Sequence, residues 1–265
     1  MIAVLRIAVI AAIFLSLTFA LLPLQLIAMN TGMQLMRYLP RWWHRIMAPV
    51  IGLRIVTHGK PARERPLLLV SNHVSWKDII VLGAVADVVF VAKSEVKDWP
   101  VFGWLARLQR SVFVEREKKR STTTQVGDMA GRLAAGEIVV LFPEGTTSDG
   151  NAILPFKTSL FGAAAAVLPD VPGNTVHIQP VTIAYTGIHG MPMGRYHRPI
   201  AAWPGSVTLV PHLLRVLKEG ALDVEVIFGE PVAFDATTDR KAIARRIEAE
   251  IRETLAAALR GRARG

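Results

Sequence analysis

The sequence SNHVSWKD at residues 71–78 places a histidine and an aspartate close enough to act as a pair. A carboxylate that folds back onto an imidazole fixes its tautomer, leaves the other ring nitrogen basic and stabilises the imidazolium that forms when a proton is taken. His73 and Asp78 therefore predict a general base that acts on a hydroxyl. The alternative is a helix-capping Asp beside a solvated His. No metal site is expected, because one His and one Asp supply too few ligands.

A second polar segment, FPEGTTSDG at residues 142–150, also follows an apolar run and is rich in hydroxyls and glycines. Such a loop can turn backbone N–H groups toward an anion or an oxyanion. It lacks the G-K-[ST] signature and is therefore not a Walker loop. An ordinary polar turn explains residues 148–150 well, but it explains Glu144, a carboxylate directly after Pro143, less well.

Two cations follow other apolar runs. Arg116 ends the run VFVER at residues 112–116 and suits bidentate contact with a phosphate or a carboxylate. Lys93 ends the run VVFVAK and points either into the same pocket or into water. The charges that follow Arg116 are also explained by a solvated face near anionic lipid.

Together these segments resemble the motifs of one family, the glycerophospholipid acyltransferases related to 1-acylglycerol-3-phosphate O-acyltransferase (PlsC-like). The first motif is similar to Asn72-His73-x4-Asp78, the second to residues 112–116 and the third to residues 142–146. Pro180, in the run IQPVT, resembles the fourth motif, and FGEP at residues 228–231 resembles a common late segment. The resemblance covers residues 65–185 well and the remainder loosely.

The resemblance implies transfer of a fatty acyl group from acyl-CoA or acyl carrier protein to the hydroxyl of a lysophospholipid, with no further cofactor. His73 would be the base and Asp78 its partner. A thioester is already activated, so such an enzyme needs a base, an oxyanion donor and close placement more than a covalent nucleophile. The residues expected to bind substrate are Asn72, Ser75, Lys93, Arg116, Glu144, Gly145, Thr146 and Pro180.

The chain departs from the family pattern at two positions. Thr147 stands where the third motif usually has an arginine that could hold a phosphate, and Arg110 replaces the glycine that often opens the second motif. The acceptor we expect first is 1-acylglycerol-3-phosphate, which would give phosphatidate. The alternative is lyso-ornithine lipid or another lysolipid, because the stretch from residue 144 to residue 157 is similar to bacterial members that include lyso-ornithine lipid acyltransferases.

Alternating apolar runs and helical patterns are expected to position these residues. Strands are predicted at residues 67–70, 88–91, 112–114 and 138–142, and helices at 78–86, 123–135, 159–167, 211–218 and 240–259. The first of these helices would be capped by Ser75, with Asp78 completing a capping-box-like start. The pattern predicts an α/β fold with a central, mostly parallel or mixed sheet flanked by helices, and residues 49–265 form the predicted catalytic domain.

The amino terminus is predicted to attach the chain to a membrane. Residues 7–29 carry no charge, and a helix of that length matches the hydrocarbon core of a bilayer. Pro23 would kink the helix, so a spanning and a re-entrant helix are both compatible with the sequence. A cleaved signal peptide is the alternative, but the mixed arginines and aromatics at residues 37–45 suit the headgroup region. We therefore predict a membrane anchor at residues 1–48, in a bacterial inner membrane with the catalytic domain facing the cytoplasm.

Composition narrows the class of protein. The 265 residues include 31 Lys+Arg and 21 Asp+Glu, for a net charge of +10, which favours anionic partners such as membrane lipids. With no cysteine, the chain has no disulfide framework, zinc–cysteine site or cysteine nucleophile. A non-catalytic basic membrane adaptor is the alternative from another class. Nucleic acid is not an expected partner, because the cations are scattered and no recognised binding module is present.

Overall fold

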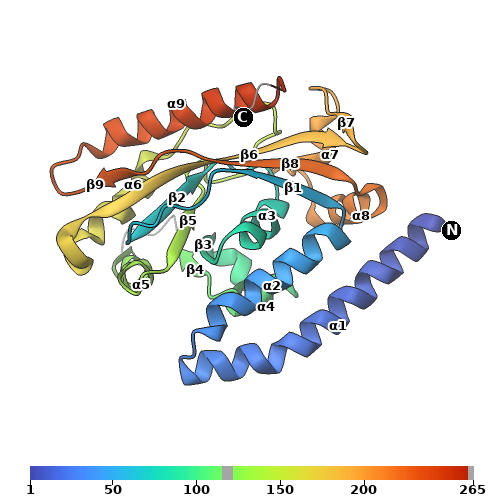
Figure 1. The fold of residues 1–265 in the computed structure, drawn as a ribbon, viewed down its shortest axis with the longest axis horizontal. Helices are drawn as coiled ribbons and strands as arrows, with labels where there is room; N and C mark the ends of the chain where they lie inside the picture. The colour runs from blue at the N-terminus through green and yellow to red at the C-terminus, as the bar shows by residue number, and fades with distance from the viewer. Residues whose placement is uncertain (115–121, 262–265) are drawn as a thin grey trace.

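A mixed nine-stranded sheet forms the centre of the protein in the computed structural model, which describes residues 1–114 and 122–261 (Figure 1). The strands are β1 (Leu53–His58), β2 (Leu67–Ser71), β3 (Val88–Lys93), β4 (Val112–Val114), β5 (Ile138–Leu141), β6 (Val176–Ile188), β7 (Met191–Pro192), β8 (Leu222–Phe228) and β9 (Val232–Phe234). The α-helices are α1 (Ile2–Thr31), α2 (Leu35–Val50), α3 (Lys77–Val85), α4 (Phe102–Leu108), α5 (Thr122–Ala134), α6 (Thr158–Ala166), α7 (Arg198–Ala201), α8 (Leu209–Glu219) and α9 (Arg240–Ala258).

The order of the strands brings the polar segments to one edge of the sheet. Along the main path the order is β1-β8-β6-β2-β5-β3-β4, with β7 and β9 paired to β6. Strands β2, β5, β3 and β4 are parallel to their neighbours, whereas β8 runs antiparallel to β6. The α/β class with a mixed central sheet is therefore confirmed. Since β2, β3 and β5 all point the same way, the residues that follow them share one edge.

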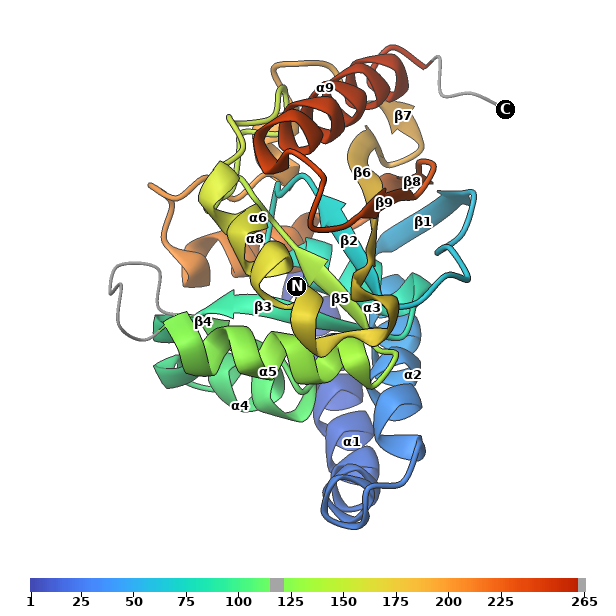
Figure 2. The same ribbon diagram turned by 90° about the vertical axis from the view of Figure 1, so that its left-hand side faces the viewer.

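Helices cover both faces of the sheet, and this explains the uninterrupted apolar runs of the central strands. In β2, Leu68 and Val70 belong to the core formed with α5, α6 and α9, whereas Leu67 and Leu69 belong to the core formed with α2 and α3. All four side chains are fully buried. Figures 1 and 2 show α9 on one side of the sheet and α2 and α3 on the other.

The strands predicted at residues 67–70, 88–91, 112–114 and 138–142 are present, and each predicted helix begins and ends within two residues of an observed one. The predicted Ser75 cap is only half right. Asp78 accepts the N–H of Ser75 at 2.9 Å, as in a capping box, but the N-cap residue is Trp76, one residue later, and it makes no side-chain cap before the helix begins at Lys77. The boundary at residue 48 stays a prediction, and α2 continues to Val50.

Helix α1 is the one described helix that is long and apolar enough to cross a membrane, and it continues through Pro23. It also contacts the globular part at two distant points. Arg6 Nη1 donates to the carbonyl of Glu219 at 3.3 Å, and Gln25 Nε2 donates to the carbonyl of Leu108 at 2.8 Å. These two contacts are about 28 Å apart along the helix. Helix α1 therefore lies alongside the domain, next to α2, instead of projecting from it (Figure 1).

Helix α2 packs closely on α3 because a glycine makes room for an imidazole. The His44 ring lies against Gly83, where an added Cβ would stand 2.4 Å from His44 Cδ2. His44 Nε2 and Gln109 Oε1 are 2.8 Å apart, and burial lowers the pKa of His44 to about 4. The ring is therefore neutral at pH 7 and fixes α2 to α3 by packing and to Gln109, at the end of α4, by one hydrogen bond.

We expect Gly83→Ala to lower the free energy of unfolding by about 1–3 kcal/mol, because the new methyl group overlaps the buried His44 ring. The matched control is Gly131→Ala in α5, another helical glycine, whose added Cβ would meet nothing within 4 Å. It should instead gain about 0.5–1 kcal/mol from helix propensity. Denaturant unfolding of the full chain in detergent measures both, and equal effects would contradict this packing.

Candidate active site

The polar segments after β2 and β5 meet at the carboxyl edge of the sheet. β2 pairs in parallel with β5, with Val70 opposite Leu141. Beyond these strands, the N–H of Ser148 donates to the carbonyl of His73 at 2.8 Å, which ties the two loops together. Two segments that lie about 70 residues apart in the sequence therefore form one site.

His73 and Asp78 form the predicted pair. His73 Nδ1 lies 2.8 Å from Asp78 Oδ2, and the side chains are 19% and 0% exposed. A carboxylate only accepts hydrogen bonds, so the proton of the neutral ring sits on Nδ1 and Nε2 has a free lone pair. The histidine is therefore oriented as a base, and the alternative of a solvated His beside a capping Asp does not describe this geometry.

Asp78 is held by donors on both carboxylate oxygens. Oδ2 also accepts the N–H groups of Val74 at 2.6 Å and of Ser75 at 2.9 Å, and Oδ1 accepts the hydroxyl of Tyr185 at 2.8 Å. Asp78 also lies in the first turn of α3, where the helix dipole favours negative charge. These contacts fix the carboxylate and, through it, the His73 ring.

A buried lysine lies beside the pair. The Lys77 ammonium donates to the carbonyl of Ala201 at 2.6 Å and to Ser75 Oγ at 3.1 Å, and it lies over the rings of Trp76 and Tyr185. Burial lowers its pKa to about 7, and the charge of Asp78 opposes that shift. The predicted site residue Ser75 is fully buried and orients this lysine.

Glu144 joins two loops of the site instead of facing solvent. Its Oε1 accepts the N–H of His73 and its Oε2 accepts the N–H of Leu154, each at 2.6 Å. The side chain is buried, and this burial raises its pKa to about 7 despite the two hydrogen bonds that favour the charged form. Glu144 therefore fixes the backbone on which the histidine is mounted.

The rest of the 142–148 loop surrounds the histidine. The Phe142 ring stacks on the His73 ring with centroids 4.1 Å apart. Gly145 has a positive φ of 74°, which disfavours any residue with a Cβ, and an added Cβ would also stand 2.7 Å from the end of the flexible Lys157 side chain. Thr146 is exposed, whereas Thr147 is buried and its hydroxyl donates to the carbonyl of Trp203.

The other predicted site residues occupy different surroundings. Asn72 is fully buried, and its amide exchanges hydrogen bonds with the backbone of Ile183 in β6 at 2.8 and 2.9 Å. Pro180 is buried in β6 opposite Val70 of β2. Lys93 ends β3 at the same edge as His73, but its half-exposed side chain pairs with Glu95 at 2.7 Å. Arg116 lies outside the described residues.

Three residues of the site were not predicted from the sequence, namely Tyr185, Lys77 and Phe142. Tyr185 lies in the run VTIAYTG, where a tyrosine within an apolar strand signals a buried hydroxyl that needs a partner. Lys77 lies next to Asp78 in the first turn of α3, and nothing in its local sequence indicates that it is buried. Phe142 was noted only as part of a motif.

The pKa of Glu144 predicts a pH-dependent stability. A folded-state pKa of about 7 lies above the usual 4.5, so the stabilising contribution is complete below pH 4.5 and is lost as the pH rises through about 7. Glu144→Gln does not titrate, so its free energy of unfolding should fall less steeply over this range. Below pH 4.5 it should also be lower than that of the unmodified chain by about 1–3 kcal/mol, because one backbone N–H loses its acceptor, and this difference should shrink as the pH rises.

Denaturant unfolding of the full chain at several pH values measures this slope. Glu253→Gln, on the exposed face of α9, is the matched control and should keep the slope of the unmodified chain. Equal slopes for Glu144→Gln and the control would contradict the assignment.

Comparison with known proteins identifies the family. The family model described as Acyltransferase matches residues 54–184, which include both loops of the site. The lyso-ornithine lipid O-acyltransferase of Rhizobium meliloti strain 1021 is 60% identical over 259 residues, 98% of this chain and 89% of that protein. The 1-acyl-sn-glycerol-3-phosphate acyltransferase of Neisseria gonorrhoeae is 33% identical over 78% of this chain and 75% of its own length.

A solved structure agrees on the fold. The crystal structure of the 1-acyl-sn-glycerophosphate acyltransferase PlsC from Thermotoga maritima matches 97% of this chain and 95% of that chain with a TM-score of 0.67. At 20% identity this similarity concerns the fold alone. On the family model and the relatives of high identity, the chain belongs to the PlsC-like acyltransferase family.

Proposed function

We propose that this protein is a lyso-ornithine lipid O-acyltransferase, which transfers a fatty acyl group from acyl-CoA or acyl carrier protein to the free hydroxyl of lyso-ornithine lipid. The proposal replaces 1-acylglycerol-3-phosphate, the acceptor expected first. It is supported by the 60% identity to the R. meliloti enzyme of that name, against 33% to the N. gonorrhoeae enzyme named for the phosphate-bearing acceptor.

The proposed choice of acceptor is based on the surroundings of Thr147. This residue stands where the family motif has an arginine, and its buried hydroxyl is bound to the carbonyl of Trp203. A guanidinium at this position would offer a bidentate contact to a phosphate, whereas a threonine that is already hydrogen-bonded offers none. This favours an acceptor without a phosphate group.

The geometry of the histidine supplies the chemistry of transfer. His73 Nε2 takes the proton of the acceptor hydroxyl, whose oxygen attacks the carbonyl carbon of the thioester. The C–S bond then breaks, and the leaving thiolate takes the proton from the imidazolium. Asp78 stabilises the imidazolium between these two steps. We place the stabilisation of the oxyanion at the 144–148 loop, which lies beside His73.

Helices α1 and α2 would hold this site at a bilayer. The exposed side chains of α1 include Leu5, Phe19 and Ile27, and those of α2 include Trp42 and Ile46, all between 44% and 67% exposed. Since α1 contacts the domain at both ends, we propose that it lies along one leaflet, with the domain at the cytoplasmic surface of a bacterial inner membrane. The lysolipid acceptor would then reach the site from the bilayer surface.

An acceptor assay tests the proposed function. Purified full chain is given acyl-CoA or acyl carrier protein thioester with either lyso-ornithine lipid or 1-acylglycerol-3-phosphate. We expect kcat/KM to favour lyso-ornithine lipid by at least about tenfold, which is the equivalent of about one good hydrogen bond. A preference for 1-acylglycerol-3-phosphate would overturn the choice of acceptor.

The same assay tests the base. His73→Ala should lose about 10²–10⁴-fold in rate, the usual contribution of general-base catalysis. His197→Ala, at an exposed position, is the control and should keep the full rate. If His73→Ala transferred acyl groups at the rate of the unmodified chain, the mechanism would be wrong.

Tyr185 is expected to act as a positioning residue. Tyr185→Phe removes the donor to Asp78 Oδ1, so the carboxylate is less firmly held and its charge acts more fully on the His73 imidazolium. We expect kcat to fall about tenfold with little change in KM, and the acid limb of the pH–rate profile to move to higher pH. Tyr196→Phe, which is 90% exposed, is the matched control. An unshifted acid limb would show that Tyr185 is structural only.

A further inference from the structure

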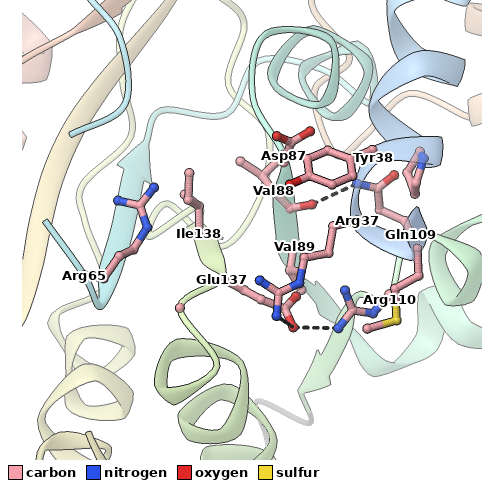
Figure 3. Close-up of a pocket in the computed structure, with 13 residues that line it drawn as sticks. Arg37, Tyr38, Arg65, Asp87, Val88, Val89, Gln109, Arg110, Glu137 and Ile138 are labelled. Carbon is pink, nitrogen blue, oxygen red and sulfur yellow. Dashed lines mark hydrogen bonds and ion pairs between the residues drawn. The ribbon is translucent and has the colours of Figure 1, made fainter. Parts of the chain in front are cut away.

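A second cluster of charged groups lies at the opposite edge of the sheet from His73. Figure 3 shows a cavity of about 190 Å³ at the amino-terminal ends of the parallel strands β2, β3 and β5. Arg65 precedes β2, Asp87 precedes β3 and Glu137 precedes β5, and all three line the cavity. Because the loops of the acyl-transfer site follow the other ends of these strands, the cavity is separate from that site.

Arginines outnumber carboxylates around this cavity. Glu137 is buried and lies 2.6 Å from Arg110, 3.5 Å from Arg132 and 3.9 Å from Arg37. One carboxylate therefore neutralises only one of three guanidinium groups. In Figure 3, dashed lines join the Glu137 carboxylate to both Arg37 and Arg110.

The other wall of the cavity adds to the excess of positive charge. Asp87 pairs with Arg41 at 3.1 Å and is fully offset by it. Arg65 stands apart, beyond Ile138 in Figure 3, and donates to the backbone carbonyls of Ala62 and Glu64 at 2.7 Å. Among the described residues that line the cavity, three guanidinium groups thus stand beside two carboxylates, and Arg41 and Arg132 pair with these carboxylates without lining the cavity.

A buried guanidinium nitrogen without an acceptor indicates the kind of ligand that this cavity would hold. Among the arginines of residues 1–114 and 122–261 that line the cavity, Arg37 has a buried Nε atom with no hydrogen-bond partner. A buried N–H group without a partner costs free energy that an incoming oxygen would recover. Asp87 Oδ1 is also buried and unpaired, so a ligand with a hydroxyl or an ammonium beside its anionic group would satisfy both kinds of atom.

The cavity opens beside the helix pair that we propose to lie on the bilayer. Its wall includes Met36, Arg37 and Tyr38, from the first turn of α2. Tyr38 and the nearby Met33 are 45% and 51% exposed, in line with the exposed apolar side chains of α1. A phosphate at the surface of a bilayer would therefore reach the arginines from the side where α2 begins.

We propose that this cavity binds the phosphate group of an anionic phospholipid headgroup, as a docking site distinct from the acyl-transfer site. Guanidinium groups suit this ligand, because their planar N–H pairs match the oxygens of a phosphate. That the phosphate belongs to a lipid rests on the proposed membrane attachment. That the cavity binds a phosphate does not. The site would fix the rotation of the domain on the bilayer, and so the height of His73 above it.

Ligand-induced stabilisation of the full chain in neutral detergent tests the proposal. Soluble dihexanoyl phosphatidylglycerol, inorganic phosphate and dihexanoylglycerol are titrated separately, and the rise in unfolding temperature gives each apparent Kd. We expect phosphatidylglycerol to stabilise the chain, and inorganic phosphate to bind at least about tenfold more weakly because it lacks the glycerol hydroxyls and the acyl chains. Dihexanoylglycerol should give no effect. Equally tight binding of inorganic phosphate would overturn the assignment to a lipid.

Arginine variants test whether phosphatidylglycerol binds in this cavity. Arg37→Gln/Arg65→Gln should weaken the apparent Kd for phosphatidylglycerol by at least about tenfold, because two charge-assisted contacts are lost. The control Arg245→Gln/Arg252→Gln removes the same charge from exposed positions of α9 and should leave the Kd unchanged. If the double variant does not fold, Arg65→Gln alone serves, since its guanidinium makes no side-chain ion pair in the described residues. An unchanged Kd in these arginine variants would overturn the proposal.

A further comparison separates this site from the acyl-transfer site. His73→Ala should bind phosphatidylglycerol as tightly as the unmodified chain, and lyso-ornithine lipid should not displace it. Displacement by lyso-ornithine lipid would place the ligand in the acyl-transfer site and refute a second site. A chain that binds phosphatidylglycerol but does not acylate lyso-ornithine lipid would refute the proposed function alone.

Discussion

The site depends on one buried carboxylate. Asp78 is fully buried and holds four donors, namely the His73 ring, two backbone N–H groups of its own loop and the Tyr185 hydroxyl. Burial of an ion is costly unless its hydrogen bonds are made, and here both oxygens are occupied. The carboxylate therefore determines the conformation of the loop and the tautomer of the histidine together, so that the same contacts stabilise the fold and orient the imidazole.

The pairing of the strands in the sheet makes this arrangement possible. The parallel pairing of β2 with β5 sets the His73 loop beside the Glu144 loop, and the pairing of β2 with β6 places Tyr185 beneath Asp78. Asn72 fastens the end of β2 to β6 through the backbone of Ile183. Residues 72–78, 142–148 and 183–185 are thus parts of one rigid unit, although more than 100 residues separate its ends. Preorganisation of this kind removes the cost of ordering the base during the reaction.

The sequence patterns predicted those structural features that depend on residues close together in the sequence. The spacing of His73 and Asp78 across a strand-to-helix junction, and the apolar runs of β2, β3, β4 and β5, were sufficient to predict the hydrogen-bonded pair and the centre of the sheet. Partners that come from distant strands leave no local signal, and for this reason the donor from Tyr185 was not predicted. Glu144 and Asn72 were expected to bind substrate, but their polar atoms are bound to backbone groups, a contact that depends on tertiary structure. The proposed acceptor preference depends in the same way on Thr147 and Trp203, which lie 56 residues apart.

The ring nitrogens of His73 provide the most direct test of the central claim, that Asp78 orients this imidazole as a base. Full chain labelled with 15N-histidine, compared with a His73→Gln variant for assignment, gives the protonation of each nitrogen by NMR at about pH 8.5, where an ordinary histidine is neutral. The account predicts a proton on Nδ1 and a free lone pair on Nε2. A His73 ring that carries its proton on Nε2 at this pH would contradict it.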